Sequence, residues 1–373
     1  MNIKSLNRLY YDWWKNIDKT IFLLIIFLFS LGLFFSLVST SLMASDKLDT
    51  NNYFFFFKHL AFIFTGILIL IFFSLLSEKK LFKISIYLFF ISLFFLSLVP
   101  IIGTEVNGSK RWLNLFFLPQ FQPIEFVKPF IIVFVSTILC SEKNFNIYTK
   151  YLLTIAAIIP ASFLLMMQPD IGQTFVVFLS WALLIFISGV SLPIILTFIC
   201  FSLLSLFYLF FFIPKFFYIK NRILSFFNPN EGTHNFQSDK AIEAISSGGF
   251  FGKGIGEGTL KTRVPEAHTD YIVSVIAEEF GVVTIILLLI LFLFFIYSVF
   301  KKVNLEESEK IKLILVGSVS LIIFQVLIHL GVNIRLFPTT GMTLPFLSYG
   351  GSSIISVSIL SGIILNLTKR KIN

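Results

Sequence analysis

The sequence predicts an all-α polytopic membrane protein with about ten transmembrane helices. Of the 373 residues, 57% are hydrophobic and only 13% are charged, whereas a soluble domain carries about 25% charged residues. The apolar residues gather in runs that are long enough to cross a bilayer, which takes about 20 residues per helix. These runs cover residues 20–43, 54–76, 82–102, 121–140, 151–167, 171–189, 191–213, 271–299, 311–332 and 350–367.

The runs differ in how strongly apolar they are. Residues 20–43 exceed the length of a signal-peptide core and lack a clear small-residue cleavage site, so we expect them to remain as a helix. Run 121–140 begins with polar residues, and run 151–167 is short and contains a proline. Both features are typical of helices that face protein or water in places. Cys140 and Cys200 lie in or at the end of apolar runs, and we interpret them as small hydrophobic residues.

The basic residues predict the orientation of the chain in the membrane. An even number of spans places both chain ends on one side, and the tails and short loops on that side hold most of the Lys and Arg residues found in short connections. The positive-inside rule therefore predicts that both ends are cytoplasmic. We expect a tail at 1–19, one membrane domain at 20–367 and a second tail at 368–373. The same rule explains the net charge of +9. Because no basic stripe with interleaved aromatic residues is present, nucleic acid is not an expected partner.

The predicted outer side carries the polar motifs. Residues 214–270 form an outer loop of about 57 residues, and loops of that length are usually functional. The other outer motifs are Asn107–Trp112, Gln122–Lys128, Gln168–Gly172 and Pro338–Ser353. The predicted cytoplasmic loops are short and charged by comparison. We therefore expect the function of the protein to reside at its outer face.

Two pairs of charged residues in these motifs each allow two interpretations. Glu125 and Lys128 are three residues apart at the start of a helix, so they lie on one face. They fit an ion pair that lowers the cost of burial, and they also fit a ligand or water pathway. Lys110 and Arg111 precede Trp112, a combination found at the headgroup level of membranes. The same two cations would also suit a phosphate group.

The segment Ser246–Gly258 contains closely spaced glycines within the outer loop. It is not a nucleotide-binding loop, because the Walker spacing and a surrounding βαβ unit are both absent. Two interpretations remain. The segment is either a flexible loop, or its backbone N–H groups approach a pyrophosphate.

The stretch Pro265–Asp270 places Glu266, His268 and Asp270 directly before an apolar run. In an extended segment these alternate residues would point the same way, and their types also allow a metal site. Asp270 is either the N-cap of the next helix or a general base with a raised pKa in a water-filled cleft. Glu278 lies two helical turns further on, about 12 Å along the axis, and we expect it to line the same cleft.

Four separated motifs carry a family resemblance: Gln168–Asp170, Gln237–Ser238 with Gly248–Gly249, Pro265–Asp270 and Leu344–Ser353. Together they resemble the SEDS family, the bacterial proteins of shape, elongation, division and sporulation. The resemblance extends over residues 100–355, and the long outer loop between the seventh and eighth predicted helices agrees with it. Ala267 and Thr339–Thr340 are more similar to the division branch of this family than to the elongation branch.

The resemblance implies a peptidoglycan glycosyltransferase in the bacterial plasma (inner) membrane, with its active face outside the cytoplasm. Such an enzyme polymerises lipid II into glycan strands and releases undecaprenyl pyrophosphate. The resemblance assigns Asp270 as the base that accepts a proton from the hydroxyl group of the acceptor sugar. It also implies a divalent cation, Mg²⁺ or Mn²⁺, whose ligands the sequence does not identify. The implied partners are a class B penicillin-binding transpeptidase and other membrane proteins of the divisome.

The tentative substrate-binding residues are Lys110, Arg111, Glu125, Lys128, Glu266, His268, Glu278, Arg335 and Ser348. The basic residues of this set would hold the pyrophosphate of the donor, whose charge grows as it leaves. The resemblance implies these roles, and spacing alone does not establish them.

Three alternatives use the same helices and polar motifs. One is an elongation-type polymerase, and the second is a lipid II flippase. The third is a proton-coupled transporter in which Glu125, Glu278 and Asp270 form a relay. A translocation path needs ionisable groups on both faces or at mid-depth, whereas here they cluster on the predicted outer side. We therefore favour chemistry at the outer leaflet, since fold alone does not decide function.

Overall fold

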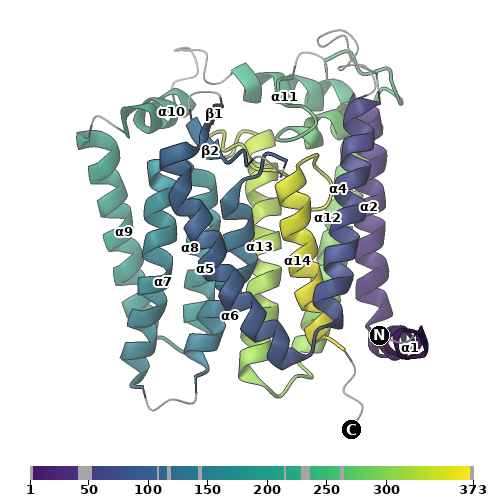
Figure 1. The fold of residues 1–373 in the computed structure, drawn as a ribbon. Coiled ribbons are helices and arrows are strands. Elements are labelled where there is room, and N and C mark those ends of the chain that lie inside the picture. The colour runs from purple at the N-terminus through teal and green to yellow at the C-terminus, as the bar shows by residue number, and fades with distance from the viewer. Residues whose placement is uncertain are drawn as a thin grey trace.

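The computed structural model places long apolar helices side by side, with shorter helices lying across both ends of the bundle (Figure 1). It describes residues 3–40, 53–106, 109–115, 119–141, 145–213, 216–227, 236–260 and 264–369. Asn107 and Gly108 of the first outer motif lie outside the described residues, as do parts of the predicted outer loop and of both predicted tails.

The described bundle helices coincide with the ten predicted apolar runs to within a few residues at each end. They are α2 (Lys19–Thr40), α4 (Phe54–Leu75), α5 (Glu78–Ile102), α6 (Pro123–Leu139), α7 (Ile147–Met167), α8 (Ile171–Ile187), α9 (Leu192–Phe212), α12 (Ile272–Val303), α13 (Glu309–Asn333) and α14 (Gly351–Leu367). Helix α5 begins four residues before its apolar run because its first turn consists of charged residues, which a hydropathy pattern does not include.

Seven helices in the described part of the chain are long and apolar enough to cross a membrane. The other three bundle helices, α6, α8 and α14, have 17 residues each, which is the lower end of the spanning range of about 17–25 residues. Helices α6 and α14 are buried along most of their length and form the interior of the bundle. Helix α8 is buried along one side and exposes large apolar residues such as Phe175 and Phe186 on another.

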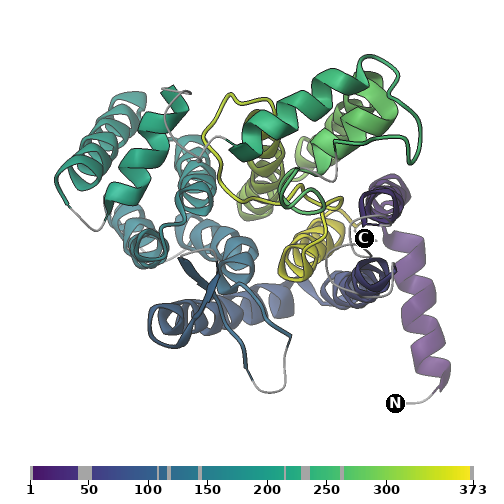
Figure 2. The same ribbon diagram turned by 90° about the horizontal axis from the view of Figure 1, so that it is seen from above.

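The centre of the bundle consists of α13 and α14 (Figure 2). Within the apolar window of α13, 78% of the residues are buried, compared with 6% in the peripheral helix α9. Helix α14 packs along α4, and side chains at Gly66 or Gly362 would collide with atoms of the facing helix. Small residues permit such close approach of helices in membranes, where packing rather than the hydrophobic effect drives association.

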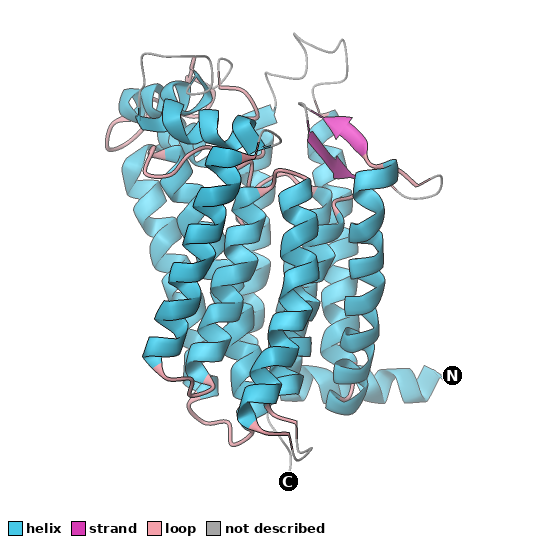
Figure 3. Cartoon of the chain, turned by 90° about the vertical axis from the view of Figure 1, so that its left-hand side faces the viewer, coloured by secondary structure: helices cyan, strands magenta, loops and turns pink. Residues whose placement is uncertain are grey.

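Shorter elements cover the two ends of the bundle (Figures 1 and 3). We call the end that carries the predicted outer loop the outer-loop end. It holds a two-stranded antiparallel hairpin, β1 (Thr104–Val106) with β2 (Ser109–Trp112), and the helices α10 (Phe217–Phe227) and α11 (Phe236–Gly248). Both chain termini lie at the opposite end, the termini end, together with α1 (Ile3–Asn16). The hydropathy pattern does not predict these short elements because they are polar or amphipathic.

The glycine-rich segment is a fixed structure packed against α12. Side chains at Gly248 or Gly252 would overlap the backbone carbonyl groups of Ala277 or Glu279. Helix α12 is kinked at Gly281, whose φ of 81° and ψ of 172° are not helical. This conformation is rarely open to residues with a Cβ atom. The segment is therefore packed against α12 at Gly248 and Gly252, whereas Gly249 and Gly256 have open space around them.

The backbone N–H groups of this segment are occupied by two buried glutamates of α12. The Lys253 and Gly254 amides donate to the carbonyl oxygens of Glu278 and Glu279, each at 3.0 Å. The Gly256 amide donates to Oε2 of Glu279 at 2.9 Å, and the Leu260 amide donates to Oε1 of Glu278 at 2.8 Å. The amides of Lys253, Gly254 and Gly256 are therefore occupied by glutamate, whereas the approach of other amides of the segment to a pyrophosphate stays a prediction.

The close approach at Gly248 is testable by substitution. We expect Gly248→Ala to destabilise the protein by about 3 kcal/mol, the upper part of the range for overpacking, because the overlapping atom belongs to the backbone and cannot rotate away. The thermal midpoint of the purified protein measures this effect. The control is Gly249→Asn, since Gly249 has a φ of 59° and open space around it, a conformation that Asn tolerates. An equal midpoint for both variants would contradict this assignment.

Candidate functional site

The stretch Pro265–Asp270 forms a compact turn rather than an extended segment. The carbonyl oxygen of Glu266 accepts hydrogen bonds from the amides of Thr269, Asp270 and Tyr271 at 3.1–3.3 Å. Helix α12 begins at Ile272, and its N-cap position is Tyr271, without a side-chain cap. Two sequence interpretations are therefore wrong. The stretch is not extended, and Asp270 is not the helix N-cap.

Residues from the end of α13 and the start of α14 hold this turn in place. Asn333 Nδ2 donates to the carbonyl oxygen of Asp270 at 3.1 Å and to that of His329 at 2.8 Å. Ser348 Oγ donates to the carbonyl oxygen of Thr269 at 2.7 Å. The Tyr349 amide donates to the carbonyl oxygen of His268 at 3.0 Å. The backbone around Asp270 is therefore fixed by elements more than 60 residues away in the sequence.

The side chain of Asp270 approaches Arg111 across Gly341. A Cβ atom on Gly341 would lie 3.4 Å from Oδ2 of Asp270 and 3.7 Å from Nη1 of Arg111. The distance between Oδ2 of Asp270 and Nη1 of Arg111 is therefore no greater than the sum of these two distances. Gly341 has a φ of 69°, which favours glycine, so the space between the carboxylate and the guanidinium is free of a side chain. Asp270 and Arg111 are both partly exposed.

The guanidinium of Arg111 is oriented by the turn that follows α7. Its Nε donates to the carbonyl oxygen of Gln168 at 3.3 Å, and its Nη2 donates to that of Pro169 at 2.9 Å. Its Nη1 lies 3.7 Å from Oδ2 of Asp170. Two hydrogen bonds and one ion pair fix the plane of the group, as the geometry of guanidinium allows. Arg111 is therefore held in position before any substrate binds.

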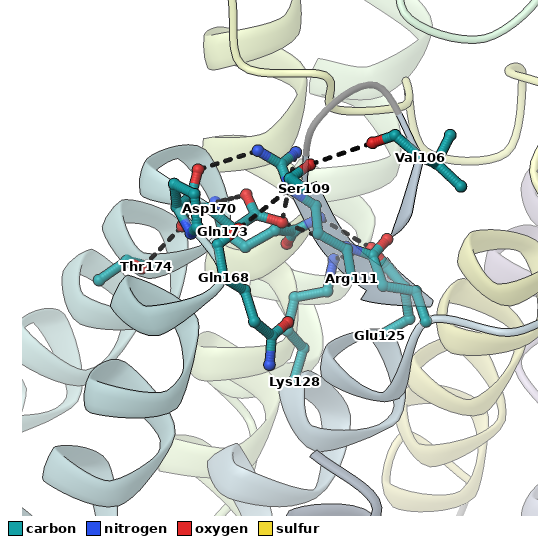
Figure 4. A network of polar contacts seen from close by, with 11 residues as sticks. Val106, Ser109, Arg111, Glu125, Lys128, Gln168, Asp170, Gln173 and Thr174 are labelled. Atoms are coloured by element: carbon teal, nitrogen blue, oxygen red, sulfur yellow. Dashed lines mark hydrogen bonds and ion pairs between the residues drawn. The ribbon is translucent and has the colours of Figure 1, made fainter. Parts of the chain in front are cut away.

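A chain of buried polar contacts continues from Asp170 into the bundle (Figure 4). Asp170 caps α8 by accepting from the Gln173 amide at 3.3 Å, and Gln122 Nε2 donates to its Oδ2 at 3.2 Å. Gln173 Nε2 donates to Oε1 of Glu125 at 2.9 Å. Lys128 Nζ donates to the same oxygen at 2.8 Å. Charges away from water are usually paired in this way, and the ion pair proposed for Glu125 and Lys128 is present.

Three of the four basic residues expected at the pyrophosphate do not face Asp270. Lys128 is 1% exposed and is bonded to Glu125. Arg335 pairs with Asp239 of α11 at 2.5 Å. Lys110 is exposed on β2 next to Arg111, and successive strand residues point to opposite sides of a sheet. Spacing along the chain placed Lys110 and Arg111 together, whereas the strand separates their side chains.

Glu278 does not line a cleft with Asp270. It is fully buried and bonds to the Leu260 amide, with Lys253 Nζ at 3.6 Å. The expected alignment assumed a helix running through both acids, but the helix begins only at Ile272. Glu278 therefore holds the outer loop and is not a substrate-binding residue in this arrangement.

The remaining predicted residues surround the turn. Glu266 is exposed. The ring of His268 lies 5.3 Å from Phe55 and 5.7 Å from Tyr349, measured between ring centroids. Burial lowers the pKa of His268, and the carboxylate of Glu266 opposes that shift. Burial also raises the pKa of Tyr349 to about 12, so both side chains are neutral near pH 7. Ser348 is buried and acts on the backbone of the turn.

Sequence reasoning missed three residues that build this site. Asp170 was part of a motif but was assigned no role, Asn333 directly follows the apolar run 311–332, and Gly341 carries no functional group. A buried Asn or Gln in a membrane helix is a usable signal, because an unpaired amide in that environment is costly. Nothing in the sequence indicates that Gly341 lies between the two charged groups.

The described residues contain no group of three or more His, Cys, Asp or Glu residues that could hold a metal ion. In particular, Glu266, His268 and Asp270 do not form such a group among the described residues. A metal site made of these three residues is therefore not supported.

These features define a polytopic membrane protein with a carboxylate and a guanidinium brought together at its outer-loop end. The family model described as "Cell cycle protein", which covers FtsW, RodA and SpoVE, matches residues 18–373. The chain belongs to this family, and the resemblance read from the motifs is confirmed.

Curated relatives and solved structures agree with this assignment. Probable peptidoglycan glycosyltransferase FtsW of Caulobacter vibrioides is 31% identical over 362 residues, covering 96% of this chain and 91% of that one. FtsW of Haemophilus influenzae is 30% identical, with coverages of 96% and 93%. A structure reported for the coordination of polymerization and crosslinking by a peptidoglycan synthase complex has a TM-score of 0.76 at 26% identity, covering 94% and 97%. Thermus thermophilus RodA has a TM-score of 0.67 at 27% identity, covering 94% and 96%.

The role of Asn333 in holding the turn is testable. We expect Asn333→Ala to speed hydrogen exchange at the amides of Thr269, Asp270 and Tyr271 about tenfold, because it leaves a buried carbonyl without a donor at a cost of about 1–3 kcal/mol. Hydrogen–deuterium exchange with mass spectrometry measures this change. Asn304→Ala, at an exposed residue beyond the other end of α12, should leave exchange in the turn unaltered. If Asn333→Ala also leaves it unaltered, Asn333 does not position Asp270.

Proposed function

We propose that this protein is a peptidoglycan glycosyltransferase that polymerises lipid II and releases undecaprenyl pyrophosphate. The observation that carries the proposal is that the Asp270 carboxylate and the Arg111 guanidinium meet at Gly341, each within 4 Å of the place where a Cβ atom would lie. A base and a fixed cation close to each other suit a reaction that removes a proton and expels an anion. The relatives named peptidoglycan glycosyltransferase support the same conclusion.

The reaction assigns a separate task to each group. A hydroxyl oxygen of the acceptor sugar attacks the anomeric carbon of the donor and forms the new glycosidic bond. The bond from that carbon to the pyrophosphate oxygen breaks, and the electron pair leaves with the pyrophosphate. Asp270 accepts the hydroxyl proton, and attack from the opposite face inverts the anomeric centre. Arg111 is held in position beforehand, so it would stabilise the growing negative charge without reorganisation.

The lipid chain of the donor would lie in an apolar groove near this site. The groove has a volume of about 250 Å³ and lies between α5, α6 and α14, with Phe95, Phe121, Pro123 and Ile355 among its lining residues. Pro123 directly follows Gln122, whose side chain bonds to Asp170. A polyprenyl chain is apolar, and burying it in such a groove would be favourable.

The orientation and partners belong to the same proposal. We place the outer-loop end outside the cytoplasm of a bacterial inner membrane and both termini inside, as the basic loops predict. A class B penicillin-binding transpeptidase is the expected partner, since a similar structure is part of a peptidoglycan synthase complex that coordinates polymerization and crosslinking. The relatives named FtsW favour septal synthesis together with other divisome membrane proteins.

Replacement of the base tests the mechanism. We expect Asp270→Asn to lower the rate of glycan formation about 10²–10⁴-fold, the usual contribution of a general base. The assay supplies lipid II to the purified protein with its transpeptidase partner and resolves glycan chains by gel electrophoresis. The matched control, Glu257→Gln, changes an exposed acid of the outer-loop end and should polymerise at the wild-type rate. Long chains from Asp270→Asn would remove the base assignment. Scrambling of labelled lipid II by a wild type that makes no polymer would assign a flippase instead.

The divalent cation implied by the family remains a prediction. Mg²⁺ is commonly bound by one or two carboxylates together with the phosphates of a substrate, so we expect any cation to arrive with the donor. Chelation with EDTA should then reduce polymerisation at least about tenfold while leaving the thermal midpoint of the substrate-free protein unchanged. A midpoint that falls on chelation would reveal a resident metal. Undiminished polymerisation in EDTA would remove the cation from the proposal.

A further inference from the structure

Helix α1 lies across the termini end of the bundle and extends sideways from α2 (Figures 1 and 3). The corner between the two helices is fixed by Asp18. Its Oδ1 accepts from the Ile21 amide at 3.1 Å, and its Oδ2 pairs with Lys302 of α12 at 2.7 Å. These contacts set the direction of α1 relative to α2 and α12.

One side of α1 is docked on the bundle. Trp13 is 6% exposed, and its Nε1 donates to Ser74 Oγ at 2.8 Å, at the end of α4. Its ring meets that of Phe22 edge-on, with 5.9 Å between the centroids. Ile17 is 3% exposed beside it. These contacts hold α1 at the level where the apolar helices α2 and α4 end, which is where the headgroups of a bilayer lie.

Other sides of α1 leave large aromatic residues uncovered. Tyr10 and Tyr11 are 65% and 66% exposed, and Trp14 is 38% exposed. At about 100° per residue, positions 10 and 14 lie about 40° apart around the helix. By the same helical periodicity of the sequence, the basic positions 4, 8 and 15 fall within another arc of about 40°, centred about 120° away, and position 11 falls beside that arc. The helix has one acidic residue, Asp12, so it carries net positive charge.

We propose that α1 is a binding surface for the headgroups of anionic phospholipids in the leaflet on the side of the chain termini. Tyr and Trp prefer the boundary between headgroups and acyl chains, and a helix with a separate basic arc lies in that plane. Lys and Arg near the surface are attracted to anionic lipid. Lys19, whose Nζ lies 5.7 Å from the Trp14 ring centroid, extends the positive charge toward α2. The inference does not depend on the proposed glycosyltransferase activity.

The test measures how deeply α1 lies in lipid. Two variants of the full-length chain, both with Cys140→Ser and Cys200→Ser, carry one nitroxide each, at Tyr10→Cys or at Asp12→Cys. Each variant is reconstituted in nanodiscs. Power saturation in oxygen and in a nickel chelate gives the ratio of lipid-side to water-side accessibility. In nanodiscs with one-third phosphatidylglycerol, we expect this ratio to be about threefold higher at position 10 than at position 12. In phosphatidylcholine alone, the difference should shrink to less than half.

Charge variants distinguish headgroup binding from simple burial of aromatic rings. Lys4→Ser, Arg8→Ser and Lys15→Ser combined should reduce the difference in phosphatidylglycerol to its phosphatidylcholine value. Lys310→Ser with Lys312→Ser removes two basic residues of α13 at the same end of the bundle and should leave the difference intact. An equal difference in both lipids, or none in either, would overturn the inference. Protection of position 10 only on adding the partner transpeptidase would assign the surface to a protein.

Discussion

Three hydrogen bonds from the last third of the chain hold the turn that carries Asp270. Asn333, Ser348 and Tyr349 each donate to a carbonyl oxygen of this turn. At the edge of a bilayer, irregular backbone is tolerated only where protein or water satisfies its polar groups. The two inner helices α13 and α14 supply those partners from their outer ends. Both helices are buried along most of their length, so the frame around Asp270 is anchored in the centre of the bundle.

The charged residues of the site differ in their access to water. Asp270 and Arg111 are partly exposed, whereas Asp170, Glu125 and Lys128 below them are buried. Removing one partner of a buried pair leaves the other charge uncompensated, at a cost of about 3–5 kcal/mol. The inner contacts therefore fix the turn after α7 and the start of α6, and Arg111 bonds to that turn. This division separates a rigid polar interior from the two groups that can meet a substrate.

The outer loop is held by the same helix that follows the turn of Asp270. Glu278 and Glu279, in the short buried part of α12 before its kink, bind amides of the glycine-rich segment. The kink at Gly281 lets the long spanning part of α12 leave in another direction. A single helix thus joins the turn of Asp270 to the loop above it. Both acids serve the architecture, although they resemble catalytic candidates in the sequence.

Hydropathy alone determined the class of protein and the positions of the bundle helices that the structure describes, because a bilayer requires runs of a set length and composition. The motifs, through their resemblance to a family, singled out Asp270. Only the tertiary structure decided which charged groups meet. Arg111 faces Asp270 across Gly341, whereas Lys110 and Glu278 point elsewhere. The reason is physical, since the direction of a side chain depends on turns and strands whose form is set by partners far away in the sequence.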